Sequence, residues 1–448
     1  MKQYETYKDS GIEWIGEIPE HWEIVPLKYR FAFSKGLSIT KEDLVSEGVP
    51  VISYGQVHSK VNPGTTTHDH LLRFVPSTTT NKFESAKVNV GDFIFADTSE
   101  DLEGCGNCAY IDRDGIYAGY HTIVFHSLYP SDNKYLAYLF LTDEWRSQIR
   151  SSVMGTKVYS ITQNILSKVS IILPPQEEQA RIAAWLDWKI GQVDAIVAEK
   201  EAMVADLQSY RQSVITESVT RGLNPDASLH PSGIEWLGDI PDHWSIIPLK
   251  YLLKEAMMYG ANETAEDEVF ACHPRYIRIT DISENGLLKP DTYKTLSPEK
   301  AEFYLLEKGD ILFARSGATV GKTYRFNESY PCCFAGYLIK AACAEKLNSE
   351  FLLYYTNSIA YNNWRDSIYD QSTIPNISAD KYNKLPVPVP PIAEQKALTE
   401  FLDKKTAEID ALLSDLREQI ADLRSYKASL ISEAVTGKID LRDWEPKN

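Results

Sequence analysis

The stretch Ser10-Gly-Ile-Glu-Trp-Ile-Gly-Glu-Ile-Pro-Glu-His-Trp22 occurs a second time as Ser232-Gly-Ile-Glu-Trp-Leu-Gly-Asp-Ile-Pro-Asp-His-Trp244. Ten of the thirteen positions are identical and three are conservative changes, an agreement that chance does not produce. Both copies continue into Pro-Leu-Lys-Tyr, which begins at Pro26 and at Pro248, 222 residues apart. We call this stretch the opening motif. An internal repeat dominates the architecture of a chain, so the motif predicts two similar halves.

A second repeated motif lies late in each half. Leu173-Pro-Pro-Gln-Glu-Glu-Gln179 matches Val389-Pro-Pro-Ile-Ala-Glu-Gln395 at an offset of 216 residues. A proline pair suits the first turn of a helix, so we expect a long helix after each copy of this helix-start motif. Each half is thus an opening motif, a body and a helix.

The two bodies match only weakly, but in the same order. Gly91-Asp-Phe-Ile-Phe-Ala96 aligns with Gly309-Asp-Ile-Leu-Phe-Ala314, and Gly119-Tyr120 with Gly336-Tyr337. Short segments rich in Val, Ile, Tyr and Phe alternate with Gly, Pro, Asn and Asp, and helical patterns occur at 134–150 and 349–364. We therefore predict an α+β fold with two mixed α/β globular domains.

Apolar residues recur at heptad spacing after each helix-start motif. This seam comprises Ile190, Val193, Val197, Val204, Leu207 and Val214, and then Thr406, Ile409, Leu413, Ile420, Leu423 and Leu430, with Arg211 and Lys427 at matching positions. A helix of about 40 residues is about 60 Å long, too long to be buried by one small domain. We predict an antiparallel coiled coil, with the bodies at opposite ends and an approximate two-fold axis. The alternative is that each helix packs on its own domain.

The length of 448 residues predicts two to four domains. The repeat divides the chain into a first domain with the opening motif (1–172), a first helical region (173–222), a second domain with the repeated motif (223–388), and a second helical region with a C-terminal tail (389–448).

The net charge of −17 disfavours nucleic-acid binding through the whole surface, because phosphate neutralisation needs clustered Lys and Arg. Any DNA contact must be local or supported by partner subunits.

Six scattered cysteines and a polar start without a signal peptide indicate free thiols. No apolar run is long enough to span a membrane, and we expect a cytoplasmic protein.

Two repeated helical regions that alternate with two diverged bodies resemble the DNA-specificity subunit of type I restriction-modification enzymes. The resemblance covers nearly the whole chain, and the segment Gly309-Asp-Ile-Leu-Phe-Ala-Arg-Ser-Gly-Ala-Thr-Val-Gly-Lys322 adds to it. It implies that each body reads one half of an asymmetric, bipartite double-stranded DNA site, and that the helices fix the spacing between the halves. Two modules at fixed separation do demand fixed half-site spacing.

The resemblance also implies a non-catalytic chain with no cofactor of its own. Two methyltransferase subunits would dock on the helices and modify adenine at N6. Restriction and translocase subunits would join where a full restriction complex exists, and a methyltransferase alone is the alternative. S-adenosylmethionine, ATP and Mg²⁺ would be bound by these partners.

Two motifs in the bodies have competing interpretations. Gly317-Ala-Thr-Val-Gly-Lys-Thr323 resembles a phosphate-binding loop but is one residue too short between its glycines, which favours a DNA-facing or structural loop. Cys105, Cys108, His121 and His126 fit the spacing of a zinc finger, yet the histidines fall in a strand pattern rather than a helix, which favours buried thiols and no metal site.

Candidate DNA contacts combine guanidinium, ammonium, amide and hydroxyl groups in loop patterns. In the second body they are Arg275, Arg278, Thr280, Arg315, Ser316, Lys322, Thr323, Gln371 and Ser372, and in the first body Ser53, Gln56, Thr98, Lys157 and Tyr159. The first body has Asp97-Thr98 where the second has Arg315-Ser316, so its contacts are harder to assign.

Two other functions compete with DNA recognition. The acidic charge leaves open an interaction scaffold or inhibitor on the same duplicated frame, without DNA binding. An enzyme acting alone is disfavoured, because the sequence has no Gly-rich cofactor loop, no Asn-Pro-Pro-Tyr tetrapeptide and no metal-ligand carboxylate cluster.

Overall fold

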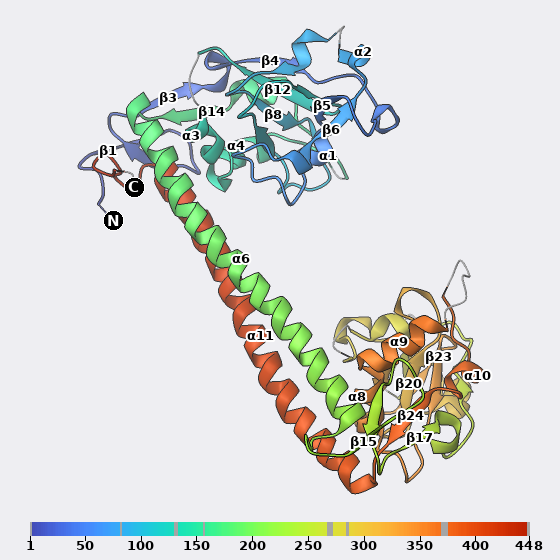
Figure 1. Ribbon diagram of the computed structural model, residues 1–448. Helices are drawn as coiled ribbons and strands as arrows, with labels where there is room; N and C mark the ends of the chain where they lie inside the picture. The colour runs from blue at the N-terminus through green and yellow to red at the C-terminus, as the bar shows by residue number, and fades with distance from the viewer. Residues whose placement is uncertain are drawn as a thin grey trace. The chain divides into compact units, whose positions relative to one another are not determined.

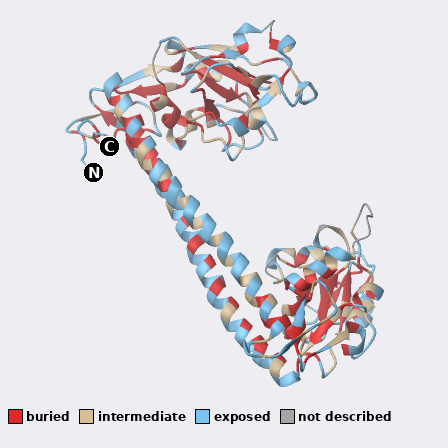
Figure 2. Ribbon diagram, in the orientation of Figure 1, coloured by how far each residue is buried: buried red, intermediate tan, exposed pale blue. Residues whose placement is uncertain are grey.

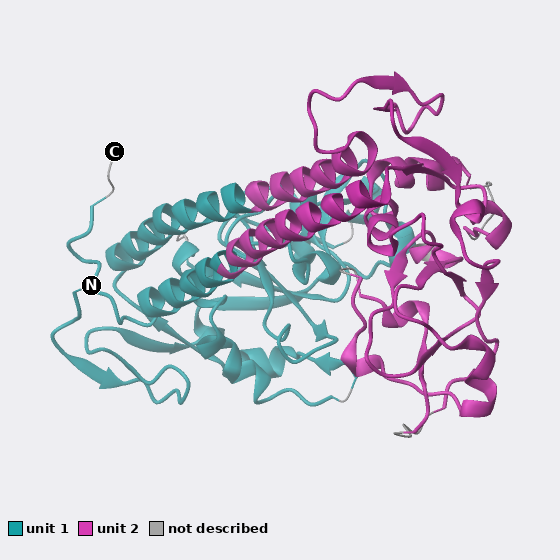
Figure 3. Ribbon diagram, turned by 90° about the horizontal axis from the view of Figure 1, so that it is seen from below, with its two compact units in different colours: residues 1–200, 419–448 teal, residues 201–418 magenta. Residues whose placement is uncertain are grey.

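The computed structural model describes residues 2–80, 83–129, 133–155, 157–266, 272–283, 286–368 and 375–445 (Figure 1). The chain divides into two compact units, residues 1–200 with 419–448 (unit 1) and residues 201–418 (unit 2), shown in two colours in Figure 3. Each unit consists of a body and of parts of two long helices, α6 (Gln176–Arg221) and α11 (Ile392–Val435).

The body of unit 1 contains two four-stranded sheets. The first is antiparallel, in the order β10 (Cys108–Tyr110), β8 (Phe93–Ala96), β12 (Thr122–Ser127), β4 (Phe31–Lys35). The second has the order β6 (Arg73–Val75), β5 (Val49–Ile52), β11 (Ile116–Ala118), β7 (Lys87–Val88), with β5 and β11 parallel. Three two-stranded pairs join β1 (Tyr7–Asp9) to β2 (Glu17–Pro19), β3 (Glu23–Pro26) to β14 (Ser170–Leu173), and β9 (Thr98–Ser99) to β13 (Tyr159–Ser160). The short helices are α1 (Tyr54–Val57), α2 (Ser77–Thr80), α3 (Lys134–Leu139), α4 (Asp143–Arg150) and α5 (Gln163–Lys168).

The body of unit 2 repeats this framework. Its antiparallel sheet has the order β18 (Met258–Tyr259), β23 (Leu338–Ala341), β20 (Ile311–Ala314), β21 (Thr323–Arg325). The parallel pair β19 (Arg275–Ile277) and β22 (Cys332–Phe334) corresponds to β5 and β11. The outer pairs are β15 (Leu229–Pro231) with β16 (Asp239–Pro241), and β17 (Ser245–Pro248) with β24 (Pro386–Val389). The short helices are α7 (Pro298–Ala301), α8 (Ser349–Thr356), α9 (Ile359–Ser367) and α10 (Ala379–Tyr382).

The repeated run Gly-Asp-x-x-Phe-Ala forms the central strand of each body. All four residues of β8 and of β20 are buried (Figure 2). Because side chains alternate between the faces of a strand, Phe93 and Phe95 enter one apolar cluster, while Ile94 and Ala96 enter another. A strand covered on both faces reads as a continuous apolar run, which explains why this motif is visible in both halves.

The long helices contact each other within each unit. In unit 1 the Lys427 ammonium lies 2.7 Å from Asp194, and in unit 2 the Arg211 guanidinium lies 2.8 Å from Asp410. In unit 1 Asp194 pairs with Lys427 and Lys200 pairs with Gln419, so the number falls on α11 as it rises on α6 and the helices run antiparallel. The two ion pairs are equivalent positions of the 216-residue repeat.

The seam side chains line these helix contacts. Buried members are Ile190, Val193, Thr406, Ile409, Leu413, Ile420 and Leu430, and half-buried members are Val197, Val204, Leu207, Val214 and Leu423. The predicted fold class, with antiparallel long helices and an internal repeat, is confirmed. The alternative in which each helix packs only on its own domain is wrong.

Candidate nucleic-acid interface

The central strands β8 and β20 end at the same position of the repeat, and the next residue is Asp97 in unit 1 and Arg315 in unit 2. The Asp97 carbonyl accepts a hydrogen bond from the Ile161 N–H at 2.8 Å, and the Arg315 carbonyl accepts one from the Ile377 N–H at 2.8 Å. The backbone is thus held identically in the two units. Only the side chains differ, one an anion and the other a cation.

The same backbone pattern corrects one detail of the sequence alignment. The N–H of Asp97 donates to the His121 carbonyl at 3.1 Å, and the N–H of Arg315 donates to the Tyr337 carbonyl at 3.0 Å. His121 is therefore the counterpart of Tyr337. The alignment of Gly119-Tyr120 with Gly336-Tyr337 is displaced by one residue, because two identical letters outweighed the hydrogen-bond register.

Unit 2 has a cleft of about 820 Å³ beside this position. Its lining includes Arg278, Thr280, Lys294, Asn262, the exposed ring of Tyr337 and one carboxylate, that of Glu263. The Arg278 guanidinium is fixed by hydrogen bonds of 2.8 and 3.1 Å to the fully buried carboxylate of Asp281. Cationic, hydroxyl, amide and aromatic groups of this kind contact phosphates and base edges.

The hollow of about 410 Å³ in unit 1 has a different character. It is lined by Tyr54, His58, Glu100, Asp101 and Glu103, among others. Three carboxylates repel phosphate, so this hollow is unsuited to the DNA backbone.

Three predicted DNA contacts are buried structural residues. The Arg275 guanidinium donates to the Tyr330 hydroxyl at 3.0 Å, and the Thr323 hydroxyl pairs with that of Thr356 at 2.8 Å. Ser53 is fully buried at the start of α1. Their burial contradicts the prediction that they contact DNA. A sequence shows the chemistry of a side chain but not its burial.

The remaining candidates lie at the surface or outside the described residues. Arg278, Arg315, Ser316, Lys322, Gln56, Thr98 and Tyr159 are partly exposed, and Thr280 and Lys157 are exposed. Gln56 accepts a hydrogen bond from the Ser53 N–H at 3.2 Å and caps α1, and Lys322 donates to the Ile282 carbonyl at 3.4 Å. Gln371 and Ser372 lie outside the described residues.

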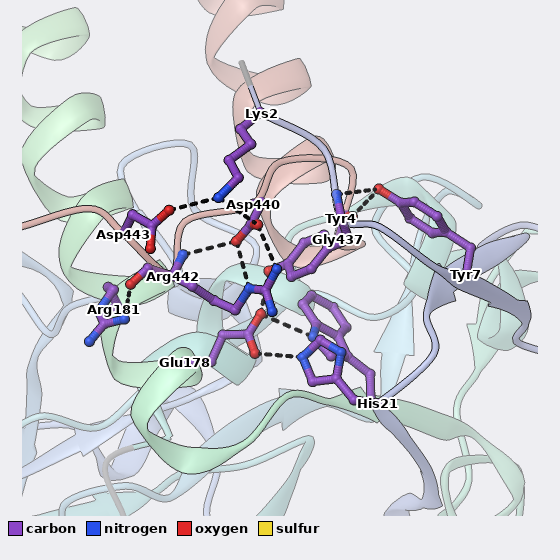
Figure 4. Close-up of polar contacts among 11 residues, drawn as sticks. Lys2, Tyr4, Tyr7, His21, Glu178, Arg181, Gly437, Asp440, Arg442 and Asp443 are labelled. Carbon is purple, nitrogen blue, oxygen red and sulfur yellow. Dashed lines mark hydrogen bonds and ion pairs between the residues drawn. The ribbon is translucent and has the colours of Figure 1, made fainter.

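The two repeated motifs meet in each unit, an arrangement that the sequence analysis missed. In unit 1 the Glu178 carboxylate lies 2.9 Å from His21 Nε2 and accepts a hydrogen bond from Trp22 Nε1 at 3.1 Å (Figure 4). In unit 2 Glu394 binds His243 at 2.8 Å and Trp244 at 3.2 Å. We call this arrangement the His-Trp-Glu clamp.

The clamp fastens the start of each long helix to its own body. It explains why the His-Trp end of the opening motif and the Glu of the helix-start motif both recur. The paired recurrence of the two motifs was the signal in the sequence from which this contact could have been inferred.

The clamp of unit 1 has an additional layer from the chain termini (Figure 4). The Tyr4 hydroxyl donates to Glu178, and the Arg442 guanidinium lies 5.0 Å from the centre of the Tyr4 ring. Arg442 also binds the carboxylate of Asp440 at 2.8 and 2.9 Å, and the Asp440 N–H donates to the Lys2 carbonyl at 2.8 Å. The C-terminal tail is therefore part of unit 1.

The cysteines and histidines that fit the spacing of a zinc finger have other contacts in the structure. Cys105 and Cys108 are buried in the main apolar cluster, and burial raises the pKa of Cys108 to about 12. His126 binds Asp92 at 3.0 Å, a hydrogen bond that raises its pKa. Among the described residues, no group of three His, Cys, Asp or Glu side chains is placed to hold a metal ion.

The glycine-rich segment of unit 2 is a hairpin connection. It lies between β20 and β21, which are antiparallel, and contains only a short 3₁₀ turn at Gly317–Thr319. A phosphate-binding loop instead joins a strand to a helix whose N-terminus faces the phosphate. The geometry therefore contradicts the phosphate-loop interpretation.

The comparisons with known proteins assign the family. The model of the type I restriction modification DNA specificity domain matches residues 19–202 and again residues 250–421. The chain belongs to this family of DNA-recognition proteins. It is a specificity subunit, and such subunits are the non-catalytic components of type I restriction-modification complexes.

Particular relatives match over almost the whole chain. The type I restriction enzyme EcoKI specificity subunit of Escherichia coli (strain K12) is 22% identical, over 97% of this chain and 92% of its own. The StySPI specificity subunit of Salmonella potsdam is also 22% identical with the same coverage.

Two solved structures share the fold. A chain from a study of complex assembly and conformational transition of the type I R-M system is 20% identical, with a TM-score of 0.70 over 94% of this chain and 99% of that chain. The HsdS subunit of Thermoanaerobacter tengcongensis is 19% identical, with a TM-score of 0.50 over 94% and 98%. Separately, no helix in the described part of the chain is long and apolar enough to cross a membrane.

Proposed function

We propose that the two units read the two halves of one bipartite DNA site. The observation that carries this proposal is the contrast at the end of the central strands, where one backbone framework presents Asp97 in unit 1 and Arg315 in unit 2. Two readers built on one frame with different side chains recognise an asymmetric sequence. The cleft beside Arg278 and Thr280 supplies phosphate and base-edge contacts in unit 2.

The long helices are proposed to set the number of unread base pairs between the half-sites. Both helices are continuous from one unit into the other. Adding equal lengths to both helices should therefore lengthen the spacer while the half-site sequences stay unchanged.

The helices are also proposed to carry two equivalent docking surfaces for a methyltransferase subunit. Ile196 and Tyr426 in unit 1 are exposed, and so are their repeat counterparts Leu412 and Tyr210 in unit 2. Exposed apolar residues that recur at one offset present the same surface twice, which suits two copies of one partner. S-adenosylmethionine, ATP and Mg²⁺ would then be bound by the partner subunits.

Point charges on these surfaces test the docking. Tyr426→Asp should reduce the number of co-purified methyltransferase subunits from two to one, and Tyr210→Asp with Tyr426→Asp should remove both. Ser209→Asp and Ser425→Asp are matched controls, because these serines are exposed neighbours at the same repeat offset. Two bound subunits in the double tyrosine variant would contradict the proposed surface.

DNA recognition itself is tested by expressing the chain with its methyltransferase subunit and mapping N6-methyladenine by single-molecule sequencing. The proposal expects a gapped, two-part motif, and binding that weakens steeply as the salt concentration rises.

A second candidate function is a scaffold or inhibitor that does not bind DNA, and the net charge of −17 favours it. That candidate expects no new methylation and no sequence preference.

A further inference from the structure

We propose that the residue after the central strand decides which base each unit accepts, an inference that rests on the proposed function. Arg315 reads a guanine in the half-site of unit 2. Asp97 accepts a hydrogen bond from the N4 amino group of a cytosine in the half-site of unit 1.

The contacts of Arg315 within the described part of the protein orient its guanidinium but leave most of its hydrogen-bond donors unpaired. Its guanidinium lies 4.8 Å from the centre of the Tyr259 ring, a stacking contact that orients the planar fork. Its Nη1 reaches the Gly336 carbonyl only at 3.5 Å, and its Nε is buried without a hydrogen-bond partner among the described residues. Within that part of the chain Arg315 forms no ion pair, in contrast to Arg278, which is bound by Asp281.

In the described part of unit 1 the only ion-pair contact of Asp97 is with the exposed His121. The Asp97 side chain is 35% exposed, and its Oδ1 lies 3.4 Å from His121 Nδ1 without forming a hydrogen bond. Buried polar atoms are normally hydrogen-bonded, so an unpartnered buried atom on each of the two side chains, Arg315 and Asp97, is unusual. Both side chains are partly exposed, and their exposed parts are what a base can reach.

The neighbouring residues support a recognition role. His121, beside Asp97, is 61% exposed and is the one described non-glycine residue with a positive φ, 54°. Such backbone strain concentrates at functional sites. Its counterpart Tyr337 is exposed on the cleft of unit 2. Each unit thus presents a charged reader beside an exposed ring.

The two readers have complementary base preferences. A guanidinium donates two parallel hydrogen bonds to O6 and N7 of guanine, the commonest specific contact in the major groove. A carboxylate only accepts hydrogen bonds, and it pairs with the N4 amino group of cytosine. An anion and a cation at one position of the repeat therefore select different bases in the two half-sites.

The test is motif sequencing of the full chain with its methyltransferase subunit. Arg315→Lys retains the charge but loses the two-pronged geometry, so preference for one guanine in one half should fall at least about tenfold while overall methylation persists. Asp97→Asn should weaken one cytosine position in the other half and favour adenine there, because an amide pairs with adenine. Arg325→Lys and Asp143→Asn are matched controls, since both residues are held in local ion pairs.

The possible outcomes separate the inference from the function. If Arg315→Lys and Asp97→Asn both give the wild-type motif, base reading by these residues is overturned. The same holds if they only lower the extent of methylation and leave the bases of the motif unchanged. Bipartite recognition would stand in both cases. Relaxation of the same half by both variants would also overturn base reading. The absence of any motif for the wild-type chain would overturn the function together with the inference. Thermal unfolding of each variant checks that the fold is retained.

Discussion

The two units have the same framework but different surfaces. Both contain a four-stranded antiparallel sheet with a fully buried central strand, a parallel strand pair, and a His-Trp-Glu clamp at the helix start. They differ at the end of the central strand and in their hollows. The hollow of unit 1 has three carboxylates, whereas the cleft of unit 2 has Arg278 and Lys294 with one carboxylate, Glu263. The repeated features hold the fold together, and the features that differ lie at the surface that we propose meets the DNA.

The units also differ in how the clamp is protected. The Glu178 side chain is 6% exposed and has Tyr4 as a third partner, whereas the Glu394 side chain is 31% exposed. The extra burial in unit 1 comes from the chain termini. The clamp should therefore stabilise unit 1 more than unit 2. In the helix seam, the contribution of each residue should depend on how deeply that residue is buried.

The largest expected effect comes from a charge in the seam of unit 2. Leu413 is buried, so Leu413→Asp should destabilise unit 2 by about 3 to 5 kcal/mol, because an unpaired carboxylate loses its hydration. The repeat counterpart Val197 is only half-buried, and Val197→Asp should cost less, about 1 to 2 kcal/mol. Denaturant unfolding measures both. Leu412→Asp is the control, because Leu412 is exposed, and a loss of stability there equal to that of Leu413→Asp would contradict the assigned seam.

The clamps give the next effect. Glu178→Ala leaves the buried Trp22 indole and the Tyr4 hydroxyl without an acceptor, and we expect a loss of about 2 to 4 kcal/mol in the free energy of unfolding of unit 1. Glu394→Ala should cost about 1 kcal/mol in unit 2, because water can replace the more exposed carboxylate. Limited proteolysis with cleavage sites assigned to each unit would measure the loss of stability of unit 1 in Glu178→Ala and of unit 2 in Glu394→Ala. Equal losses of stability in the two units would contradict the claim that the clamp of unit 1 is the stronger one.

The smallest effect is a pH dependence confined to unit 1. The hydrogen bond from Arg442 holds the pKa of Asp440 below its ordinary value of 3.8. Because the folded pKa is lowered, this stabilisation is present above pH 3.8 and is lost as the pH falls through the folded value. Asp440→Asn should lower the stability of unit 1 at neutral pH, with a difference from wild type that shrinks in acid. A difference independent of pH would contradict the Asp440–Arg442 contribution.

The repeat made most of the fold predictable. Two copies of the opening motif, two proline pairs and two matched heptad seams define the halves and the helix pair, because periodicity and turn residues act locally. The His-Trp-Glu clamp is a contact over 156 residues between Trp22 and Glu178, and no local pattern expresses it.

The candidate interface was predicted less well, for a physical reason. Arg275 and Arg278 have the same chemistry and lie three residues apart, yet one is buried within the fold and the other lines the cleft. Burial depends on tertiary packing, which residue type does not determine. The exchange of Asp97 for Arg315 was visible in the sequence, but the equivalent placement of the two residues became visible only in the backbone hydrogen bonds.

The most direct test of the central claim is exchange of one body. Residues 20–172 would be replaced by the corresponding body of another family member, and N6-methyladenine motifs would be sequenced from cells that also express the methyltransferase subunit. If the two units read separate half-sites, one half of the gapped motif changes, while the other half and the spacer stay the same. A motif that changes in both halves, or in neither, would contradict independent reading by the two units.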